Sequence, residues 1–243
     1  MSIERPAGTG PSAEPGSPLH EAAVPPTPAA MRLQILSTEH WSLLASRSLA
    51  WNESFSRAGM FLTTLSGAIV ALALVAQATD FGEGFVLFAL VILPVVLFVG
   101  VATVVRLGSS NYHDAQCVIG MNRIRGAYLE LAPDLEKYFV MSANDDARGV
   151  GVTMAMPPGG GSLLHVLAAT PSVIGVVNSV LAAAIVALVA VSLGASAIVI
   201  LVAGVVAFVA SMALHAAYGR AQVVRGQAGL RPLFPSQPTA PPD

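Results

Sequence analysis

The sequence predicts an all-α membrane protein in which four transmembrane helices form two helical hairpins, with amphipathic cytoplasmic helices and disordered, proline-rich tails. Three observations support this fold class. Of the 243 residues, 54% are hydrophobic and 11% are charged, whereas a soluble domain carries about 25% charged residues. Two long apolar blocks, Ala58–Val105 and Pro171–Tyr218, contain no arginine or lysine. Every arginine lies outside them, as expected when loops are sorted by charge across a membrane.

Residues 1–36 are predicted to form a disordered N-terminal tail. The first thirty residues are dominated by Pro, Gly, Ala and Ser, and they lack the apolar stretch of a signal peptide. Such a segment buries too little apolar surface to offset the entropy that it loses on ordering.

The first module, residues 37–141, is predicted to begin with an amphipathic helix. Ser37–His40 provides a capping hydroxyl and an early acid. Apolar or small residues then recur every three or four positions, at Trp41, Leu44, Ser48, Trp51, Phe55, Ala58 and Leu62. We expect this helix to run directly into the first span. The interfacial residues Trp41 and Trp51 suit the surface of a bilayer, and they suit a cytoplasmic helical bundle equally well.

The first hairpin is predicted to consist of spans 58–78 and 85–105. Each approaches the roughly 20 residues needed to cross the hydrocarbon core of a bilayer. The connector between them, Thr79–Gly84, contains two acids and two glycines and predicts a tight polar turn. Pro94, near the middle of the second span, predicts a kink.

A second amphipathic helix is predicted over residues 111–141, on the cytoplasmic side. Asn111 would cap it, and Pro133 would interrupt it and start a short second helix. Its apolar seam is formed by Met121, Ile124, Tyr128, Leu131, Leu135 and Tyr138. We expect this seam to pack against the Trp41–Phe55 helix.

The remaining chain is predicted to contain a linker, a second hairpin and a second tail. Residues 142–170 form the linker, with a possible interfacial helix near its end. The second hairpin covers residues 171–219, with spans 172–193 and 195–218 joined by a very short turn. Residues 220–243 are predicted to be disordered. A proline-rich tail can dock in an aromatic groove, but without a clean repeated motif we favour a solvated tail.

The basic residues predict the orientation of the spans. Arginine or lysine occurs before the first span, between spans two and three, and after span four, at Arg47, Arg57, Arg106, Arg123, Arg125, Lys137, Arg148, Arg220, Arg225 and Arg231. Neither hairpin turn contains a basic residue. We therefore expect a multi-pass protein of a bacterial cytoplasmic membrane with both termini in the cytoplasm. An unpaired Cys117 fits that reducing compartment.

Small residues predict where the helices meet, because close backbone approach supplies the contact energy between helices in lipid. Stripes at i, i+4 spacing occur in spans one, three and four. The predicted helix-packing residues are Gly59, Thr63, Gly67 and Ala71, then Gly175, Ser179, Ala183 and Ala187, then Ala203, Ala207 and Ser211. The neighbouring Asn178 either joins helices by a hydrogen bond or lines a polar pathway, and we favour the first.

Catalytic chemistry is not indicated by the sequence. His113 and Cys117 lie one helical turn apart, but they have no third or fourth partner for a metal site, and His20, His40, His165 and His215 occur singly. We predict no catalytic residue, no cofactor and no metal. The net charge of -2 gives no reason to expect a nucleic-acid partner.

The order of amphipathic helix, short hairpin and amphipathic helix, over Glu39–Met141, resembles the two-span effector modules of bacterial nucleotide-signalling conflict systems (SLATT-like modules). That resemblance implies action by membrane permeabilisation, although the extra hairpin departs from the pattern. The whole chain, with its arginine-rich, lysine-poor composition and Pro-rich tails, also resembles uncharacterised multi-span proteins of actinobacterial type.

These observations predict a non-enzymatic membrane protein that acts by helix association, as a scaffold or regulatory subunit. The expected partners are the lipid bilayer and either further copies of the chain or other membrane proteins. The alternative is a pore or permeability effector built from oligomerised hairpins.

Overall fold

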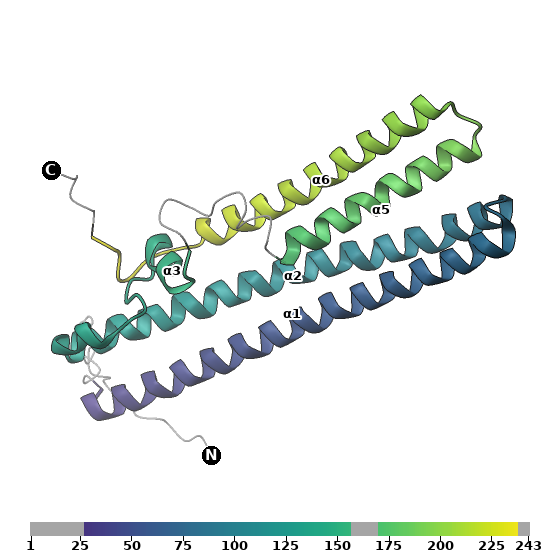
Figure 1. Ribbon diagram of the computed structural model, residues 1–243. Coiled ribbons are helices and arrows are strands. Elements are labelled where there is room, and N and C mark those ends of the chain that lie inside the picture. Colours follow the sequence, from purple (N-terminus) through teal and green to yellow (C-terminus); the bar gives the residue numbers. More distant parts are fainter. Residues whose placement is uncertain (1–26, 157–169, 238–243) are drawn as a thin grey trace, which may run out of the picture.

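The computed structural model describes residues 27–156 and 170–237, and helices make up most of them (Figure 1). The long helices are α1 (Ala29–Thr79), α2 (Glu83–Leu131), α5 (Thr170–Ser192) and α6 (Ala197–Ala228), and the short 3-10 helix η1 (Pro133–Tyr138) and helix α3 (Ala147–Thr153) lie between α2 and α5. All four long helices are long and apolar enough to cross a membrane. The predicted all-helical fold with four candidate spans is therefore confirmed.

Some predicted features lie outside the described residues. These are most of the N-terminal tail (1–26), the end of the C-terminal tail (238–243), and residues 157–169, which include the Pro- and Gly-rich linker and most of the expected interfacial helix.

Helices α1 and α2 form a long antiparallel pair (Figure 1). They contain 51 and 49 residues, and at 1.5 Å per residue each is roughly 75 Å long. That length is more than twice the roughly 30 Å of a hydrocarbon core. Both helices therefore continue far beyond the apolar segment. The continuity of α1 from the amphipathic segment into the first span is confirmed.

Several predicted boundaries are wrong. Helix α1 begins at Ala29 and not at Ser37, so residues 29–36 are helical; Met, Arg, Leu and Gln in this stretch are good helix formers. Helix α2 passes Asn111 without a break, so no separate capped helix starts there. Helix α6 continues past Tyr218 to Ala228 because no proline occurs before Pro232. Residues 220–228 are thus helical and not tail.

Most of the predicted apolar seam on α1 does not face α2, although Ala58 is buried in the core and Trp51 reaches α2 through its indole nitrogen. The side turned toward α2 includes Leu43, Arg47, Ala50 and Ser54, which are buried or half-buried. Trp41 and Phe55 remain 67% and 63% exposed. At roughly 100° per residue, the predicted seam lies about a quarter turn from the true interface. The prediction failed because polar residues occupy part of the real interface. In the second predicted seam, Met121 and Ile124 of α2 are buried as expected, but Leu135 and Tyr138 of η1 are exposed.

Helices α5 and α6 form a second pair, and this pair lies along α2. The turn between them, residues 193–196, includes Gly194 with φ of 71°, a left-handed conformation that glycine adopts without steric cost. Helix α2 contacts α1, α5, α6, α3 and η1. Its apolar side chains meet Phe61 of α1 and Ile174 and Leu181 of α5 in one buried cluster.

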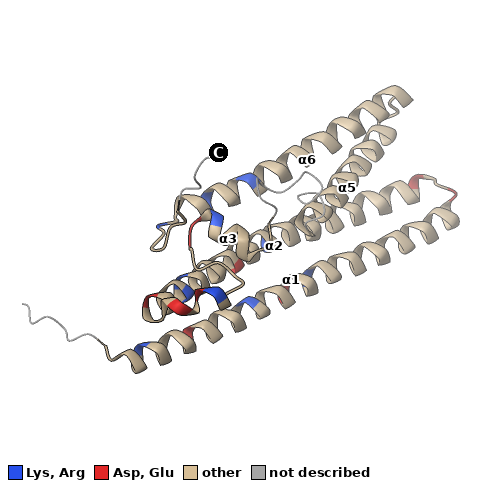
Figure 2. Ribbon diagram, turned by 60° about the vertical axis from the view of Figure 1, so that its left-hand side comes forward, with Lys and Arg blue, Asp and Glu red and all other residues tan. Residues whose placement is uncertain are grey.

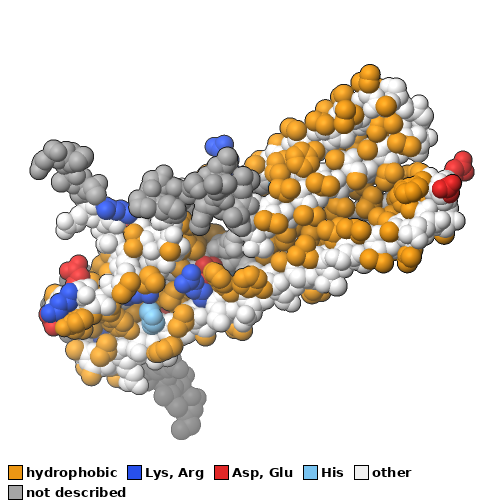
Figure 3. All heavy atoms as spheres, in the orientation of Figure 1, with side chains coloured by type: hydrophobic (Ala, Val, Ile, Leu, Met, Phe, Trp, Pro, Cys, Tyr) orange, Lys and Arg blue, Asp and Glu red, His pale blue; other side chains and the backbone are white. Residues whose placement is uncertain are grey.

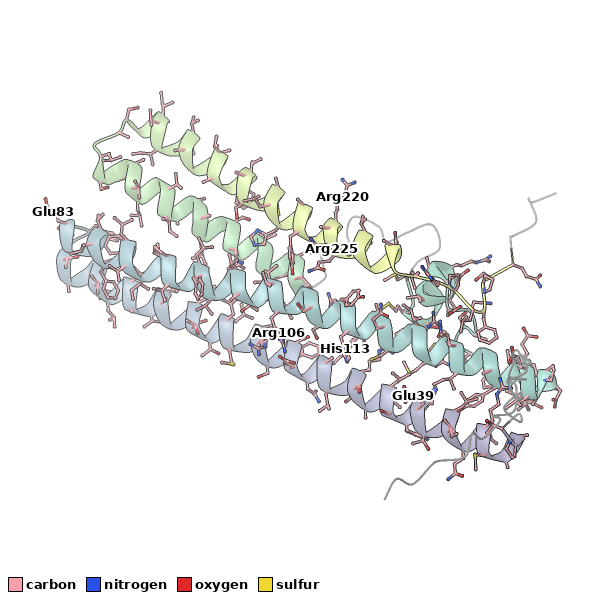
Figure 4. All side chains as sticks on the ribbon, turned by 180° about the vertical axis from the view of Figure 1, so that it is seen from behind. Glu39, Glu83, Arg106, His113, Arg220 and Arg225 are labelled. Carbon is pink, nitrogen blue, oxygen red and sulfur yellow. The ribbon has the colours of Figure 1, made fainter. Side chains whose placement is uncertain are left out.

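Charge is distributed unevenly along the molecule. The acids of the α1–α2 turn, Asp80 and Glu83, lie at one end, and the basic residues run from about the middle of α1 and α2 to the other end (Figures 2 and 4). Figure 3 shows a broad apolar surface over both helix pairs between these regions. We call the basic half the charged end. The arrangement fits an apolar belt with all of its arginines on one side.

Candidate functional site

Three helices meet at Gly100 of α2. A Cβ atom added there would lie 1.9 Å from Oδ1 of Asn178 on α5 and 2.7 Å from Cε2 of Phe61 on α1. Both contacting side chains are fully buried. Only glycine therefore fits at this position. The amide of Asn178 presses directly against the α2 backbone and fixes the height at which α5 packs.

Asn178 also joins α5 to α6 through His215. The Nδ2 and Nε2 atoms of the two side chains lie 3.3 Å apart, and Nδ1 of His215 lies 2.8 Å from the carbonyl oxygen of Ser211. A carbonyl oxygen can only accept, so Nδ1 carries the proton. In the neutral ring Nε2 then accepts from the Asn178 amide. The hydroxyl of Ser179 bonds to Oγ of Ser211 at 3.1 Å. This polar cluster lies between apolar helices.

One polar atom of the cluster has no partner. Oδ1 of Asn178 is buried and makes no hydrogen bond to any described residue. A buried unsatisfied acceptor costs about 1 to 3 kcal/mol. The amide nitrogen of Asn178 partly offsets this cost, because it makes the hydrogen bond to His215 of α6.

The predicted small stripes fall in two kinds of environment. Those of spans three and four face each other: Gly175 lies against the His215 side chain, Ser179 bonds to Ser211, and an added Cβ at Gly204 would lie 3.9 Å from Cβ of Ala187. Ala183, Ala203 and Ala207 are half-buried in the same pair. The stripe of span one differs. Thr63 is exposed, Ala71 is half-buried, and added Cβ atoms at Gly59 and Gly67 would meet no described atom within 4 Å.

Four glycines on α2, which have no regular spacing in the sequence, each pack against a side chain from a different part of the chain. Beside Gly100, Gly108 lies against Tyr218 of α6, Gly120 against Leu43 of α1, and Gly126 against the ring of Phe234; the added Cβ atoms would approach these side chains to 2.9, 2.7 and 2.7 Å. The four glycines do not recur at i, i+4 spacing, so a search for regular stripes passes over them. His215 was likewise treated as an isolated residue.

Replacing Gly100 by alanine tests the close approach. The added methyl group collides with Asn178 and Phe61, so Gly100→Ala should lower stability by about 1 to 3 kcal/mol, the usual cost of overpacking. The measurement is reversible unfolding of the purified protein in detergent. Gly67→Ala is the matched control, because its Cβ enters open space, and it should be neutral or slightly stabilising. Equal effects of the two substitutions would contradict the packing described.

Ion pairs and hydroxyl pairs join α1 to α2 at the charged end. Nε of Arg47 donates to Oδ1 of the nearly buried Asp114 at 2.6 Å, and Nε1 of Trp51 donates to the same oxygen at 3.3 Å. Ser54 and Ser110 share a hydrogen bond of 2.8 Å. Trp51 is therefore tied to α2 by its polar tip, while half of its surface stays exposed.

Two arginines share the carboxylate of Glu53. Arg106 of α2 and Arg57 of α1 each donate to Oε1 at 2.9 Å. Hydrogen bonds from Arg106 and then from Arg57 lower the pKa of Glu53 below its ordinary value, against the opposing effect of desolvation. The carboxylate is therefore ionised under physiological conditions. These exposed pairs set the register of the two helices and contribute little stability.

A second polar site lies where residues 231–237 return to the charged end of α2. We call residues 231–237 the tail segment. We call its binding surface, formed by Gly126, Asn144, Asp145 and Asp146, the cradle. Asp145 is fully buried, and its carboxylate accepts the N–H groups of Leu233 at 3.0 Å and Phe234 at 2.8 Å. The tail segment is thus bound in place, against the prediction of a solvated tail.

Further bonds complete the cradle. Asp146 accepts the N–H and the hydroxyl of Ser236 at 2.8 and 2.9 Å, and it caps α3 through the N–H of Gly149. Asn144 donates to the carbonyl oxygens of Phe234 and Pro235, each at 3.3 Å. Most of these bonds address the main chain of the tail segment.

The cradle carboxylates have lowered pKa values. Burial raises the pKa of Asp145, but the side chain of Arg123 and the N–H groups of Leu233 and Phe234 together lower it further, so the net shift is downward. For Asp146, burial also raises the pKa, and the bonds from Gly149 and Ser236 and the charge of Arg148 reverse that effect. The ionised forms are therefore the ones that bind the tail segment.

The attachment of the tail segment should depend on pH. Because the pKa values are depressed in the bound state, the stabilisation is complete above the unfolded value of about 3.9 and is lost as the pH falls through the bound-state values. A spin label at Gln237→Cys, in a Cys117→Ala background, should be immobilised at pH 6 and should become progressively more mobile as the pH is lowered below about 3.9. A label at Gly219→Cys, where the helix faces open space, should not change. Mobility at Gln237 that is already high at pH 6 would contradict the attachment.

The candidate metal ligands do not converge. Sγ of Cys117 lies 3.7 Å from Nε2 of His113, but no group of three or more His, Cys, Asp or Glu side chains that could hold a metal ion occurs among residues 27–156 and 170–237. Burial, followed by the charge of Asp114, raises the pKa of Cys117, with Arg47 opposing. The thiol is therefore protonated and is a poor nucleophile.

In comparisons with family models, curated proteins and solved structures, nothing matches this chain.

Proposed function

We propose that the protein is an integral, multi-pass protein of the cytoplasmic membrane that acts without catalysis, by helix association, as a scaffold or regulatory subunit. In this proposal the two helix pairs cross the bilayer as hairpins. The charged end and both termini lie in the cytoplasm, because arginine-bearing loops are retained there.

The observation that carries the proposal is the outer face of α1. Gly59, Thr63 and Gly67 lie along it within the apolar belt, and nothing described lies within 4 Å of the added Cβ of either glycine. Lipid gains nothing from a small-residue stripe, whereas a second helix can approach it closely and gain contact energy. Helix α2, in contrast, already contacts α1, α5, α6 and the tail segment through its glycines. Helix α1 therefore offers a small-residue surface that no described residue covers.

The extension of α1 beyond the belt supports the same surface. Leu33, Trp41, Leu44 and Phe55 are all at least 40% exposed, although they lie beyond the first predicted span on its cytoplasmic side. Clustered apolar side chains exposed to water are typical of interaction sites. A partner helix that follows α1 would cover these residues as well as the stripe.

Substitutions in the stripe test the proposal. Gly59→Leu with Gly67→Leu should weaken self-association in liposomes roughly tenfold or more, equivalent to about 1.4 kcal/mol, because the larger side chains separate the helices. Energy transfer between labelled copies at decreasing protein-to-lipid ratios measures this. Thr64→Leu is the control, since Thr64 is also exposed and bonds only to its own helix. Wild-type protein that stays monomeric, or variants that associate as it does, would refute the homo-oligomer.

The pore alternative predicts a different readout. Wild-type protein in planar bilayers would then conduct ions, and the stripe variants would lose conductance together with association. The described polar groups of the second helix pair argue against a pore within one copy, because Asn178 and Ser179 are fully buried between helices.

A further inference from the structure

The tail segment bends at Leu233 and Phe234 as it crosses the cradle. The bend directs the N–H groups of both residues at the carboxylate of Asp145. Phe234 and Ser236 are half-buried against the cradle, while Leu233 and Pro235 are exposed. The aromatic ring lies on Gly126, and the Ser236 hydroxyl bonds to Asp146. The cradle thus contacts the side chains of Phe234 and Ser236 and the backbone between them.

Bonds to α2 hold the cradle in shape independently of the tail segment. Nδ2 of the fully buried Asn122 donates to the carbonyl oxygen of Asn144 at 2.8 Å, and Thr153 and Arg125 both donate to Oδ1 of Asn122. Arg123 holds the carboxylate of Asp145 at 2.5 Å. A site whose groups are already positioned loses little entropy when its ligand binds.

The hydrogen-bonding groups of the cradle define the ligand that it accepts. Asp145 and Asp146 require free N–H groups at the positions of Leu233, Phe234 and Ser236. The cradle makes no hydrogen bond to the backbone nitrogen at position 235, which is a proline and has no N–H group. A flat ring is required over Gly126, and a hydroxyl two residues later. A cavity of about 600 Å³ continues beside the ring, lined by Leu129, Phe139 and Val152 among others.

We propose that the cradle is a peptide-recognition site, and that its ligand is a Phe-Pro-Ser segment of a partner protein whose backbone bends at the phenylalanine. The tail segment is the built-in competitor, because only Gly229 and Leu230 separate it from the end of α6, which gives it a high effective concentration. This inference names a partner class for the proposed scaffold, and it rests on that proposal only for the exposure of the cradle to the cytoplasm.

Peptide binding to the full-length protein tests the inference. The probe is a fluorescent peptide with the sequence of residues 229–237, and the readout is anisotropy in detergent, which does not depend on self-association. Phe234→Ala removes the ring contact of the protein's own tail and leaves the cradle intact. The weakened tail should compete less well, so this variant should bind the peptide at least tenfold more tightly than wild type. Adding Gly126→Ala fills the ring position and should abolish that gain. Adding Gly219→Ala, a helix glycine with open space around it, should preserve it.

A second peptide, with alanine in place of phenylalanine, should not bind any variant. The proposal is overturned if Phe234→Ala binds no better than wild type, if Gly126→Ala and Gly219→Ala act alike, or if both peptides bind equally. Wild type, Phe234→Ala and the two double variants must elute identically on size exclusion. A loss of peptide binding then reflects a change in the cradle and not unfolding of the protein.

Discussion

Close approach to the backbone of α2 is the constraint on which the rest of the structure depends. At four of the glycines of this helix, the side chain of a different neighbour occupies the space where a Cβ atom would lie: Asn178 at Gly100, Tyr218 at Gly108, Leu43 at Gly120 and Phe234 at Gly126. In lipid, apolar surface gives helices no reason to associate, so such contacts must supply the energy. Helix α2 therefore serves as the common axis for α1, the second helix pair and the tail segment.

Polar groups then determine how the neighbours are positioned. Within the apolar belt, Asn178 and His215 join α5 to α6 while the Asn178 amide rests on α2. At the charged end, Asp114, Asp145 and Asp146 each bind groups from a distant part of the chain. The buried carboxylates of Asp114 and Asp145 are tolerated there because each accepts hydrogen bonds and pairs with an arginine. Specific partners, and not a large apolar core, distinguish one packing of these helices from another.

The sequence predicts the number of long helices, their apolar segments and the uneven distribution of charge, because bilayer thickness imposes a length and a composition that can be counted. It predicts packing less well. The Trp41–Phe55 seam was a wrong prediction because the polar residues Arg47 and Ser54 belong to the real interface. The α2 glycines could not be predicted because each packs against one side chain from elsewhere in the chain, so they form no regular pattern. The tail segment looked solvated because its partners, Asn144, Asp145 and Asp146, are distant in sequence and have no pattern of their own. A pattern within a short stretch of sequence cannot predict contacts between residues that are about 90 positions apart.

A double-mutant cycle between Gly100 and Asn178 is the most direct test of this account. Unfolding free energies in detergent would be compared for Gly100→Ala, Asn178→Ala and the double variant. Asn178→Ala removes the atom closest to the new methyl group, so the account predicts that the cost of Gly100→Ala falls to less than half, with a remainder from Phe61. Costs that simply add, within about 0.3 to 0.5 kcal/mol, would show that the two residues do not meet and would contradict α2 as the axis of the fold.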